Sequence, residues 1–198
     1  AADRLSHPLV RNESGELVQA SWPEALAAAA AGLCATKAAV LVGGRTTYED
    51  AYGYSKFARV ALGTNDIDFR SRLSSEEERE FLAARVVGST TTYRDIDRAD
   101  HILLVGFEPE EESPIVFLRL NKQFRKRALK ITAIATKLSI GVEKLKGEFV
   151  KVAPGQEGAA IATQALTVKS VILVGERASE SAGALSAVGA LADLTGAK

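Results

Sequence analysis

The sequence predicts an α/β fold, in which helices cover both faces of an open, mostly parallel, doubly wound sheet. Short and nearly continuous apolar runs are typical of strands that are buried in a parallel sheet. The chain has four such runs, at 37–43, 101–106, 129–135 and 168–175. Segments with helix signals separate them, and strands that alternate with helices at this spacing favour right-handed crossovers and a sheet covered on both faces.

The first 20 residues do not follow this alternation. We expect residues 1–20 to form an extended arm with a turn at 12–15, and we assign residues 21–198 to the α/β domain. That domain opens with a helix, because Ser21 and Glu24 have the spacing of a capping box, in which each side chain bonds the other residue's backbone N–H.

The remaining elements follow from caps and apolar periodicity. Thr46 or Thr47 is expected to cap a helix that Gly63 ends, and a third helix is expected over 74–88. Further helices are expected at 114–127, 156–166 and 180–195, with a short additional strand at 149–152.

Charge and hydropathy exclude several classes of partner. The 25 basic and 25 acidic residues cancel, so no field of the whole chain would attract nucleic acid or an anionic membrane. No apolar run is long enough to span a membrane and no secretory signal is visible, so we expect no direct membrane insertion and a cytoplasmic location. Basic residues crowd one segment, where they form either a solvated face or a protein-docking surface: Arg119, Lys122, Arg125, Lys126, Arg127 and Lys130.

Metal-binding side chains are scarce. The single cysteine, Cys34, excludes an internal disulfide, an iron–sulfur cluster and a zinc site with several thiolates. It lies in an apolar helix, where a small buried side chain is expected. His7 and His101 lie far apart, so we expect no metal site. The chain also has no methionine, which indicates a processed or excised piece of a larger protein.

Any ligand site should lie at the ends of the predicted strands. In open parallel sheets, ligands bind beyond the carboxyl ends of the strands, which here are 43–50, 106–114, 135–141 and 175–183. None of these segments has the glycine spacing of a dinucleotide-binding loop. One of them carries four carboxylates just before a helix, where the helix dipole favours them and where they would repel a phosphate: Glu108, Glu110, Glu111 and Glu112.

Several segments occur in an order that resembles a known family. They are DRLSHPLVR, ASWPEAL, YSKFARVALGTNDIDFRSR, DIDRADHILLVGFEPEEESP and VAPGQEGAA. Together they resemble the molybdopterin oxidoreductase family, and more closely the C-terminal molybdopterin oxidoreductase-like domain of actinobacterial NADH-quinone oxidoreductase (respiratory complex I) G subunits. The resemblance covers nearly the whole chain.

The resemblance implies a role within a larger assembly. In that family, iron–sulfur clusters bound by cysteines precede the segment that this chain matches. The parent complex transfers electrons from NADH to quinone in the respiratory chain. The implied partners are the other peripheral-arm subunits, at the inner face of the cell membrane, and nucleic acid is not among them.

The chain departs from the catalytic members of the family at the metal-binding position. Their pattern G-T-N-N-V-D-x-x-A-R-V leads to a cysteine or selenocysteine that ligates molybdenum, and then to a histidine. The resemblance places these two positions at Ser74 and Ser75. Serine ligates molybdenum in some relatives, but the histidine is lost. We therefore expect no catalytic residue here and treat Ser74 as a relic position.

The cofactor-binding turns are also altered. The family's G-x-N-P-x-E-x-x-P turn, which helps to hold the pterin dinucleotide, begins here with Gly106, Glu108 and Pro109, so that a glutamate replaces the asparagine. The P-G-T-D turn survives loosely and ends at Glu157. These four residues are relic positions of the cofactor site. We expect no molybdopterin in this chain, while the parent protein carries iron–sulfur clusters elsewhere.

Ser74 and Ser75 have a simpler explanation as helix caps. Ser74 with Glu77 and Ser75 with Glu78 each have capping-box spacing, and no G-x-S-x-G motif surrounds either serine. The sequence thus favours a structural domain without a cofactor. One alternative is an active molybdopterin-dependent oxidoreductase domain with Ser74 as molybdenum ligand. Another is a module that binds a small molecule or nucleotide at the strand ends.

Overall fold

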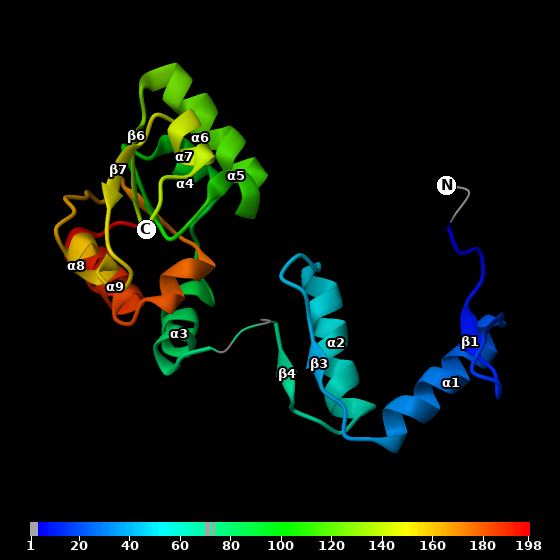
Figure 1. Cartoon of the computed structure of the whole chain (residues 1–198). Coiled ribbons are helices and arrows are strands. Elements are labelled where there is room, and N and C mark those ends of the chain that lie inside the picture. Colours follow the sequence, from blue (N-terminus) through cyan, green and yellow to red (C-terminus); the bar gives the residue numbers. More distant parts are fainter. Residues whose placement is uncertain (1–3, 70–71, 73) are drawn as a thin grey trace. The chain divides into compact units, whose positions relative to one another are not determined.

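The computed structural model describes residues 4–69, 72 and 74–198. It divides into two compact units, Ala1–Leu73 and Ser74–Lys198 (Figure 1). We call them the N-terminal unit and the C-terminal unit and describe each by itself. The predicted boundary after residue 20 stays a prediction.

The N-terminal unit begins with a small hairpin and a helix. Strands β1 (Leu9–Arg11) and β2 (Leu17–Gln19) pair antiparallel, with the turn between them. Helix α1 (Trp22–Ala35) starts at the predicted capping box, since the Ser21 backbone N–H donates to Glu24 Oε2 at 2.8 Å. No residue of α1 is buried, so the expectation of a buried Cys34 is wrong, because the helix packs no face against a core.

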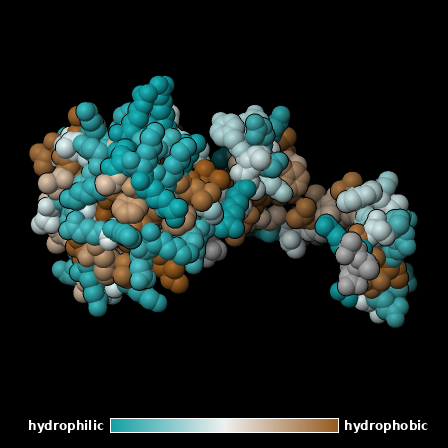
Figure 2. Space-filling view, turned by 90° about the horizontal axis from the view of Figure 1, so that it is seen from above, coloured by the Kyte–Doolittle hydropathy of each residue, from teal (hydrophilic) through white to brown (hydrophobic). Residues whose placement is uncertain are grey.

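The rest of this unit is also open to solvent. Helix α2 (Tyr48–Val60), capped by Thr47, lies between strands β3 (Val40–Leu41) and β4 (Ile67–Asp68), which pair in parallel. The buried strand expected at 37–43 is therefore only two residues long, and among the described residues it pairs with β4 alone. Of the residues that the structure describes in this unit, just Val42 and Ala58 are buried. Apolar side chains accordingly lie at its surface (Figure 2).

The C-terminal unit contains the predicted parallel sheet. Its four strands are β5 (His101–Val105), β6 (Lys130–Ala135), β7 (Glu148–Lys151) and β8 (Val171–Val174). Their order in the sheet is β7-β6-β5-β8, and every neighbouring pair is parallel. Strands β6 and β7 thus follow one another on one side of β5, and β8, the last strand in the chain, pairs with the other side of β5. Between β5 and β8 the order reverses, which is where open α/β sheets usually bind ligands.

Apolar side chains on both faces of the sheet explain why helices cover both. On β5, Ile102 and Leu104 belong to one buried cluster, whereas Leu103 and Val105 belong to a second, as expected for a strand whose side chains alternate between faces. Helices α4 (Tyr93–Arg98), α6 (Pro114–Arg127) and α7 (Ile140–Lys144) supply the first cluster. Helices α8 (Glu157–Ala162) and α9 (Ala184–Thr195) supply the second. Figure 1 shows these layers, and the doubly wound α/β prediction is confirmed.

Several short helices were not expected from periodicity. Helix α5 (Pro109–Glu112) precedes α6, and a 3-10 helix, η2 (Glu176–Glu180), precedes α9. The helix expected over 74–88 is divided into α3 (Glu76–Phe81) and a π-helical turn, η1 (Leu82–Val86). One or two turns are too short to show a helical repeat. None of the helices in the described part of the chain is long and apolar enough to cross a membrane.

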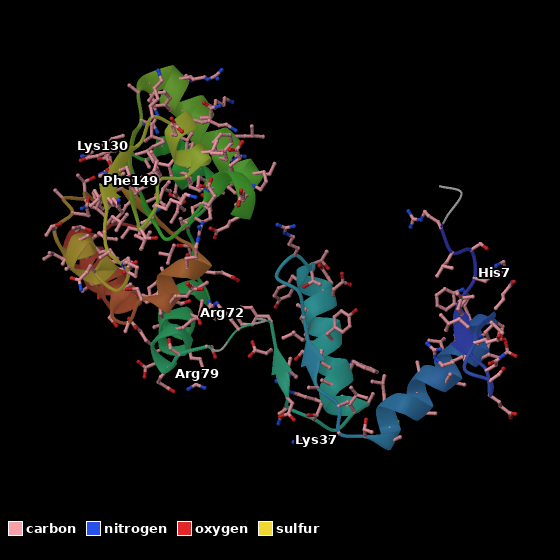
Figure 3. The ribbon with its side chains drawn as sticks, viewed as in Figure 1. His7, Lys37, Arg72, Arg79, Lys130 and Phe149 are labelled. Atoms are coloured by element: carbon pink, nitrogen blue, oxygen red, sulfur yellow. The ribbon has the colours of Figure 1, made fainter. Side chains whose placement is uncertain are left out.

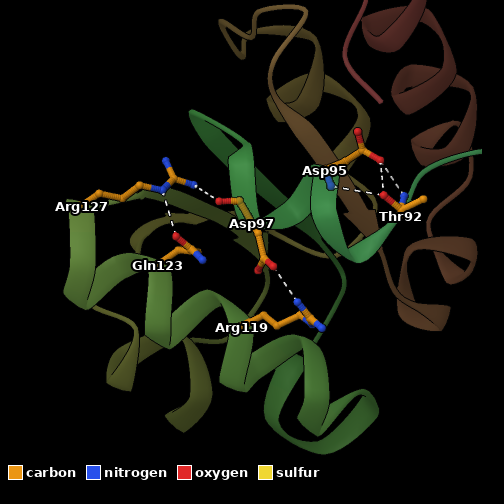
Figure 4. Close-up of polar contacts among 6 residues, drawn as sticks. All are labelled: Thr92, Asp95, Asp97, Arg119, Gln123 and Arg127. Atoms are coloured by element: carbon orange, nitrogen blue, oxygen red, sulfur yellow. Dashed lines mark hydrogen bonds and ion pairs between the residues drawn. The ribbon is translucent and has the colours of Figure 1, made fainter.

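Part of the basic segment holds α4 against α6. Arg119 donates to Asp97 Oδ2 at 2.6 Å and stacks over the Tyr93 ring, and Arg127 donates to the Asp97 carbonyl at 3.0 Å (Figure 4). Arg127 also bonds Gln123. These two arginines are therefore structural, whereas Lys122, Arg125 and Lys126 are exposed and take no part in these contacts.

His101 gives the sheet a predictable pH dependence. Its ring is buried at the start of β5, and Nε2 lies 2.8 Å from Thr132 Oγ1. Burial lowers the pKa of His101, and the positive charge of Lys130 (Figure 3) lowers it further, against weaker opposite effects of a hydrogen bond to the Ala165 backbone and of the charges of Asp100 and Glu148. The histidine is therefore neutral in the folded state at a pH where the unfolded chain, with a pKa of about 6.5, already binds a proton.

Acidification from pH 7.5 to pH 5.5 is expected to destabilise the fold. Because the unfolded state binds more protons, the free energy of unfolding rises with pH, and the contribution of His101 is lost as the pH falls below about 6.5. His101→Gln, which keeps a neutral partner for Thr132, should reduce the difference in melting temperature between pH 7.5 and pH 5.5. Thermal unfolding at both values measures this difference. An unchanged difference in the variant would show that other groups cause it.

Candidate functional site

A cavity of about 310 Å³ opens at the carboxyl ends of the strands of the C-terminal unit. Three of the four predicted strand ends contribute to its wall, whereas residues 43–50 belong to the other unit. Its apolar side includes Phe107 and Phe149, the latter visible on β7 in Figure 3. Its polar side includes Glu108, Lys137, Ser139, Glu157, Arg177, Glu180 and Ser181.

Two glycines allow the loops that follow β5 and β8 to form this cavity. Gly106 ends β5 with a positive φ of 55°, which residues with a side chain rarely adopt. A Cβ on Gly106 would lie 2.6 Å from the backbone nitrogen of Ala178. A Cβ on Gly175 would lie 2.3 Å from the carbonyl oxygen of Gly106. The two loops thus pack backbone against backbone, which places η2 beside the segment that carries Glu108.

Glu108 has a buried carboxylate in the wall of the cavity. It is 5% exposed and caps α5, since its Oε1 accepts the Glu110 backbone N–H at 3.1 Å. Its own backbone N–H donates to Glu112 Oε1 at 2.7 Å. The other carboxylate oxygen, Oε2, is buried and has no hydrogen-bond partner among the described residues. Pro109, the adjacent relic position, is buried at the start of α5.

Gly141 provides the space for this carboxylate. A Cβ on Gly141, in α7, would lie only 2.0 Å from Glu108 Oε1. Sequence reasoning missed this residue, because the short helix that contains it was not expected either.

Glu157 supplies a second buried carboxylate to the cavity. It lies in the first turn of α8 and is 9% exposed. Ser181 Oγ donates to Glu157 Oε2 at 2.6 Å, and Ser181 is itself buried. The sequence singled out Glu157 through the family turn but gave no indication of Ser181, which lies 24 residues further along the chain.

Two other carboxylates of the 108–112 cluster, those of Glu110 and Glu112, form ion pairs. Arg177 pairs with Glu112 at 3.0 Å, and Lys144 pairs with Glu110 at 2.6 Å. The positive charge of Arg177 is thus already balanced, although its side chain lines the cavity. The buried ionisable side chains of the cavity wall, Glu108 and Glu157, are both acidic.

Ser74 lies apart from the relic cofactor positions. Gly106, Glu108 and Glu157 line one cavity, but Ser74 does not. Ser75 is the N-cap of α3, as its Oγ accepts the Glu78 backbone N–H at 3.1 Å, so the predicted cap is present there. The other predicted capping box, Ser74 with Glu77, does not form, because the Glu77 carboxylate bonds to α9 instead.

Glu77 caps the N-terminus of α9 from a distant part of the chain. Its carboxylate accepts the backbone N–H groups of Gly183 at 2.9 Å and Ser186 at 2.8 Å, and also the Ser186 hydroxyl. Burial raises the pKa of Glu77, but these hydrogen bonds outweigh it and hold the pKa below its usual value. The sequence could not indicate this contact, since the partners lie 106 and 109 residues apart.

Glu77→Ala should destabilise the C-terminal unit by about 1–2 kcal/mol, because two N–H groups of α9 lose their acceptor. Chemical denaturation measures this loss. Glu80→Ala is the matched control, as it removes an exposed glutamate from the same helix and should change stability by less than about 0.5 kcal/mol. Equal effects of the two substitutions would contradict a capping role for Glu77.

Within the described residues, no group of three or more histidine, cysteine, aspartate or glutamate side chains could hold a metal ion. We predicted from the sequence that the relic positions bind no cofactor and that this chain holds no molybdopterin. The geometry of the residues does not test whether a ligand binds, so both stay predictions. Chemically, the cavity offers an apolar wall and buried carboxylates that accept hydrogen bonds.

Comparison with known proteins agrees with the resemblance found in the sequence. The molybdopterin oxidoreductase family matches residues 4–197. Over 99% of its length, the chain is 49% identical to the NADH-quinone oxidoreductase G subunit of Mycobacterium tuberculosis (strain CDC 1551 / Oshkosh) and 46% identical to that of Streptomyces coelicolor. It spans only 26% and 27% of those relatives.

A more distant relative is catalytic by name. The alpha subunit of the F420-dependent formate dehydrogenase of Methanocaldococcus jannaschii is 35% identical over 80% of this chain, which spans 24% of that relative. The predicted resemblance, to the family and more closely to the G subunits, is confirmed. The chain belongs to the molybdopterin oxidoreductase family.

Proposed function

We propose that this chain is a structural, cofactor-free domain of a G subunit of NADH-quinone oxidoreductase. The parent complex transfers electrons from NADH to quinone through iron–sulfur clusters that lie outside these residues. The observation that carries this proposal is the 46–49% identity to G subunits over 99% of the chain. Identity to the formate dehydrogenase relative is lower and covers less of the chain.

The cavity supports the cofactor-free part of the proposal. The relic positions Glu108 and Glu157 place two buried carboxylates in its wall. The family's pterin cofactor carries phosphates, and a phosphate beside a buried carboxylate meets repulsion that solvent screens poorly. Ser74, the relic metal position, is exposed and does not line the cavity. These residues fit a phosphate-bearing cofactor poorly.

The same proposal assigns partners and location. The domain contacts other peripheral-arm subunits on the cytoplasmic side of the membrane. Lys122, Arg125 and Lys126 belong to α6 and form the docking surface that we propose for these partners. These cations differ from Arg119 and Arg127, which hold α4 within the domain.

Purification of the tagged full-length protein from its native host tests this assignment. It should carry NADH:quinone reductase activity together with the other subunits. Reversing the three docking charges in Lys122→Glu, Arg125→Glu and Lys126→Glu should reduce co-purification of those subunits. A matched control reverses three lysines elsewhere in the unit, in Lys146→Glu, Lys151→Glu and Lys169→Glu, which are exposed. A full-length protein that purifies without reductase activity or partner subunits would contradict the proposal.

A further inference from the structure

We propose that the cavity at the carboxyl edge of the sheet binds a small organic cation, an alkylammonium or alkylguanidinium, with Glu108 as its counter-ion. The inference goes beyond the structural role proposed above and does not depend on the identity of the parent complex. It rests on the environment of one carboxylate, on the charges around it and on the walls of the cavity.

Glu108 Oε2 is an acceptor that lacks a donor. It is buried and unpartnered among the described residues, while Oε1 of the same carboxylate is bonded to the Glu110 backbone. A buried acceptor without a donor costs free energy, and the cost is larger for a charged group. Because Glu108 lines the cavity, a cation there would lie beside this carboxylate and would donate to it after a small rotation of the carboxylate group. A positively charged N–H group is the strongest such donor.

The charges around Glu108 also favour a cation. Glu157 adds another buried carboxylate, and Glu180 adds an exposed one at the wall. Arg177 also lines the cavity, but Glu112 already balances its charge. Among the described residues of the wall, the exposed Lys137 is the one remaining cation whose positive charge is not balanced by an ion pair. The cavity therefore favours a positive ligand over a negative one.

The walls of the cavity indicate an organic cation instead of a metal ion. Phe107 and Phe149 line it together with Leu104 and Val142, and these four side chains suit the apolar stem of an organic cation. A hard metal ion needs about six oxygen ligands, and the described residues hold no group of three or more side chains suited to a metal. A volume of about 310 Å³ is at the lower end for ligand pockets, so the ligand is small.

Gly141 keeps the carboxylate in this position. A side chain there would displace Glu108 Oε1, from which its Cβ would lie only 2.0 Å away. The buried carboxylate thus depends on the absence of a side chain at residue 141. Gly141→Ala is expected to weaken cation binding even though the charge of Glu108 remains.

Calorimetric titration of the full-length protein with butylguanidinium and with butylammonium tests the proposal. At least one of the two should bind, and Glu108→Gln should weaken that binding about tenfold or more while keeping the size of the side chain. Glu180→Gln is the matched control, since it removes one negative charge from the exposed part of the wall. Because solvent screens that charge, the control should weaken binding less than about threefold.

Two further probes separate the possible outcomes. Butyl phosphate should not bind, and Mg²⁺ should not compete with the organic cation. Amide NMR shifts of Glu108 and Gly141 in the wild-type protein should move on addition of the bound cation, which gives a test that does not rely on the stability of a variant. The proposal is overturned by no binding of either cation, by equal binding to Glu108→Gln, by tighter binding of butyl phosphate, or by Mg²⁺ binding that depends on Glu108.

Discussion

Gly106→Ala is expected to destabilise the C-terminal unit by on the order of 2–6 kcal/mol, enough to unfold a protein of marginal stability. Two costs add at this residue. Its φ of 55° strains any residue that has a Cβ, which costs about 1–3 kcal/mol. The new Cβ would also lie 2.6 Å from the backbone nitrogen of Ala178, and overpacking of this kind costs about 1–3 kcal/mol.

Neither cost at Gly106 is easily relieved. The opposing atoms belong to the backbone of η2, so no side chain can rotate away. Chemical denaturation of the full-length protein, followed by a probe in the C-terminal unit, measures the loss. A loss below about 1 kcal/mol would contradict the close packing of the loops after β5 and β8.

Gly175→Ala is expected to cause the second-largest loss of stability, through steric overlap alone. Its φ is −93°, which any residue adopts, so no backbone strain is added. A Cβ there would meet the Gly106 carbonyl oxygen at 2.3 Å and the Phe107 Cα at 2.6 Å. Overpacking against two backbone atoms should cost about 3 kcal/mol, at the upper end of the usual range.

Gly189→Ala is the matched control for both substitutions. Gly189 lies inside α9, and a Cβ there would make only ordinary contacts, at 3.7 Å or more, with the Arg85 side chain. Since alanine favours helices over glycine, this variant should be more stable by about 0.5–1 kcal/mol. If Gly175→Ala lowered the free energy of unfolding by no more than the control changes it, the close backbone contact at Gly175 would be contradicted.

The sequence predicted the two central strands of the C-terminal unit well, because β5 and most of β6 are buried on both faces. A strand such as 101–105 is almost entirely apolar, and its ends are marked by Asp100 and Gly106. Helix α6 matches its expected bounds of 114–127 because proline starts it and a basic last turn ends it. The short helices α5 and α7 were missed, since four or five residues show no period.

The N-terminal unit was predicted less well, because local pattern does not reveal what a segment packs against. Residues 37–43 are as apolar as a buried strand, yet two of them alone form β3, and Leu41 is 62% exposed. Cys34 is exposed for the same reason, since α1 covers no core. An apolar pattern predicts that a segment favours burial, but it does not supply the partner.

The residues of the candidate site were likewise predicted only in part. Family motifs in the sequence singled out Gly106, Glu108 and Glu157, and the structure brings all three to one cavity. Gly141 and Ser181 were missed, because they reach the two glutamates through tertiary packing that no motif records. Ser74 was singled out by the same motifs but does not line the cavity.

Molybdenum and pterin content of the full-length protein, purified from its native host as part of its complex, tests the central claim most directly. The account predicts far less than one molybdenum and one pterin per chain, together with intact electron transfer from NADH to quinone. Stoichiometric molybdenum and pterin would contradict it, and would show that the buried carboxylates of Glu108 and Glu157 tolerate the family's cofactor.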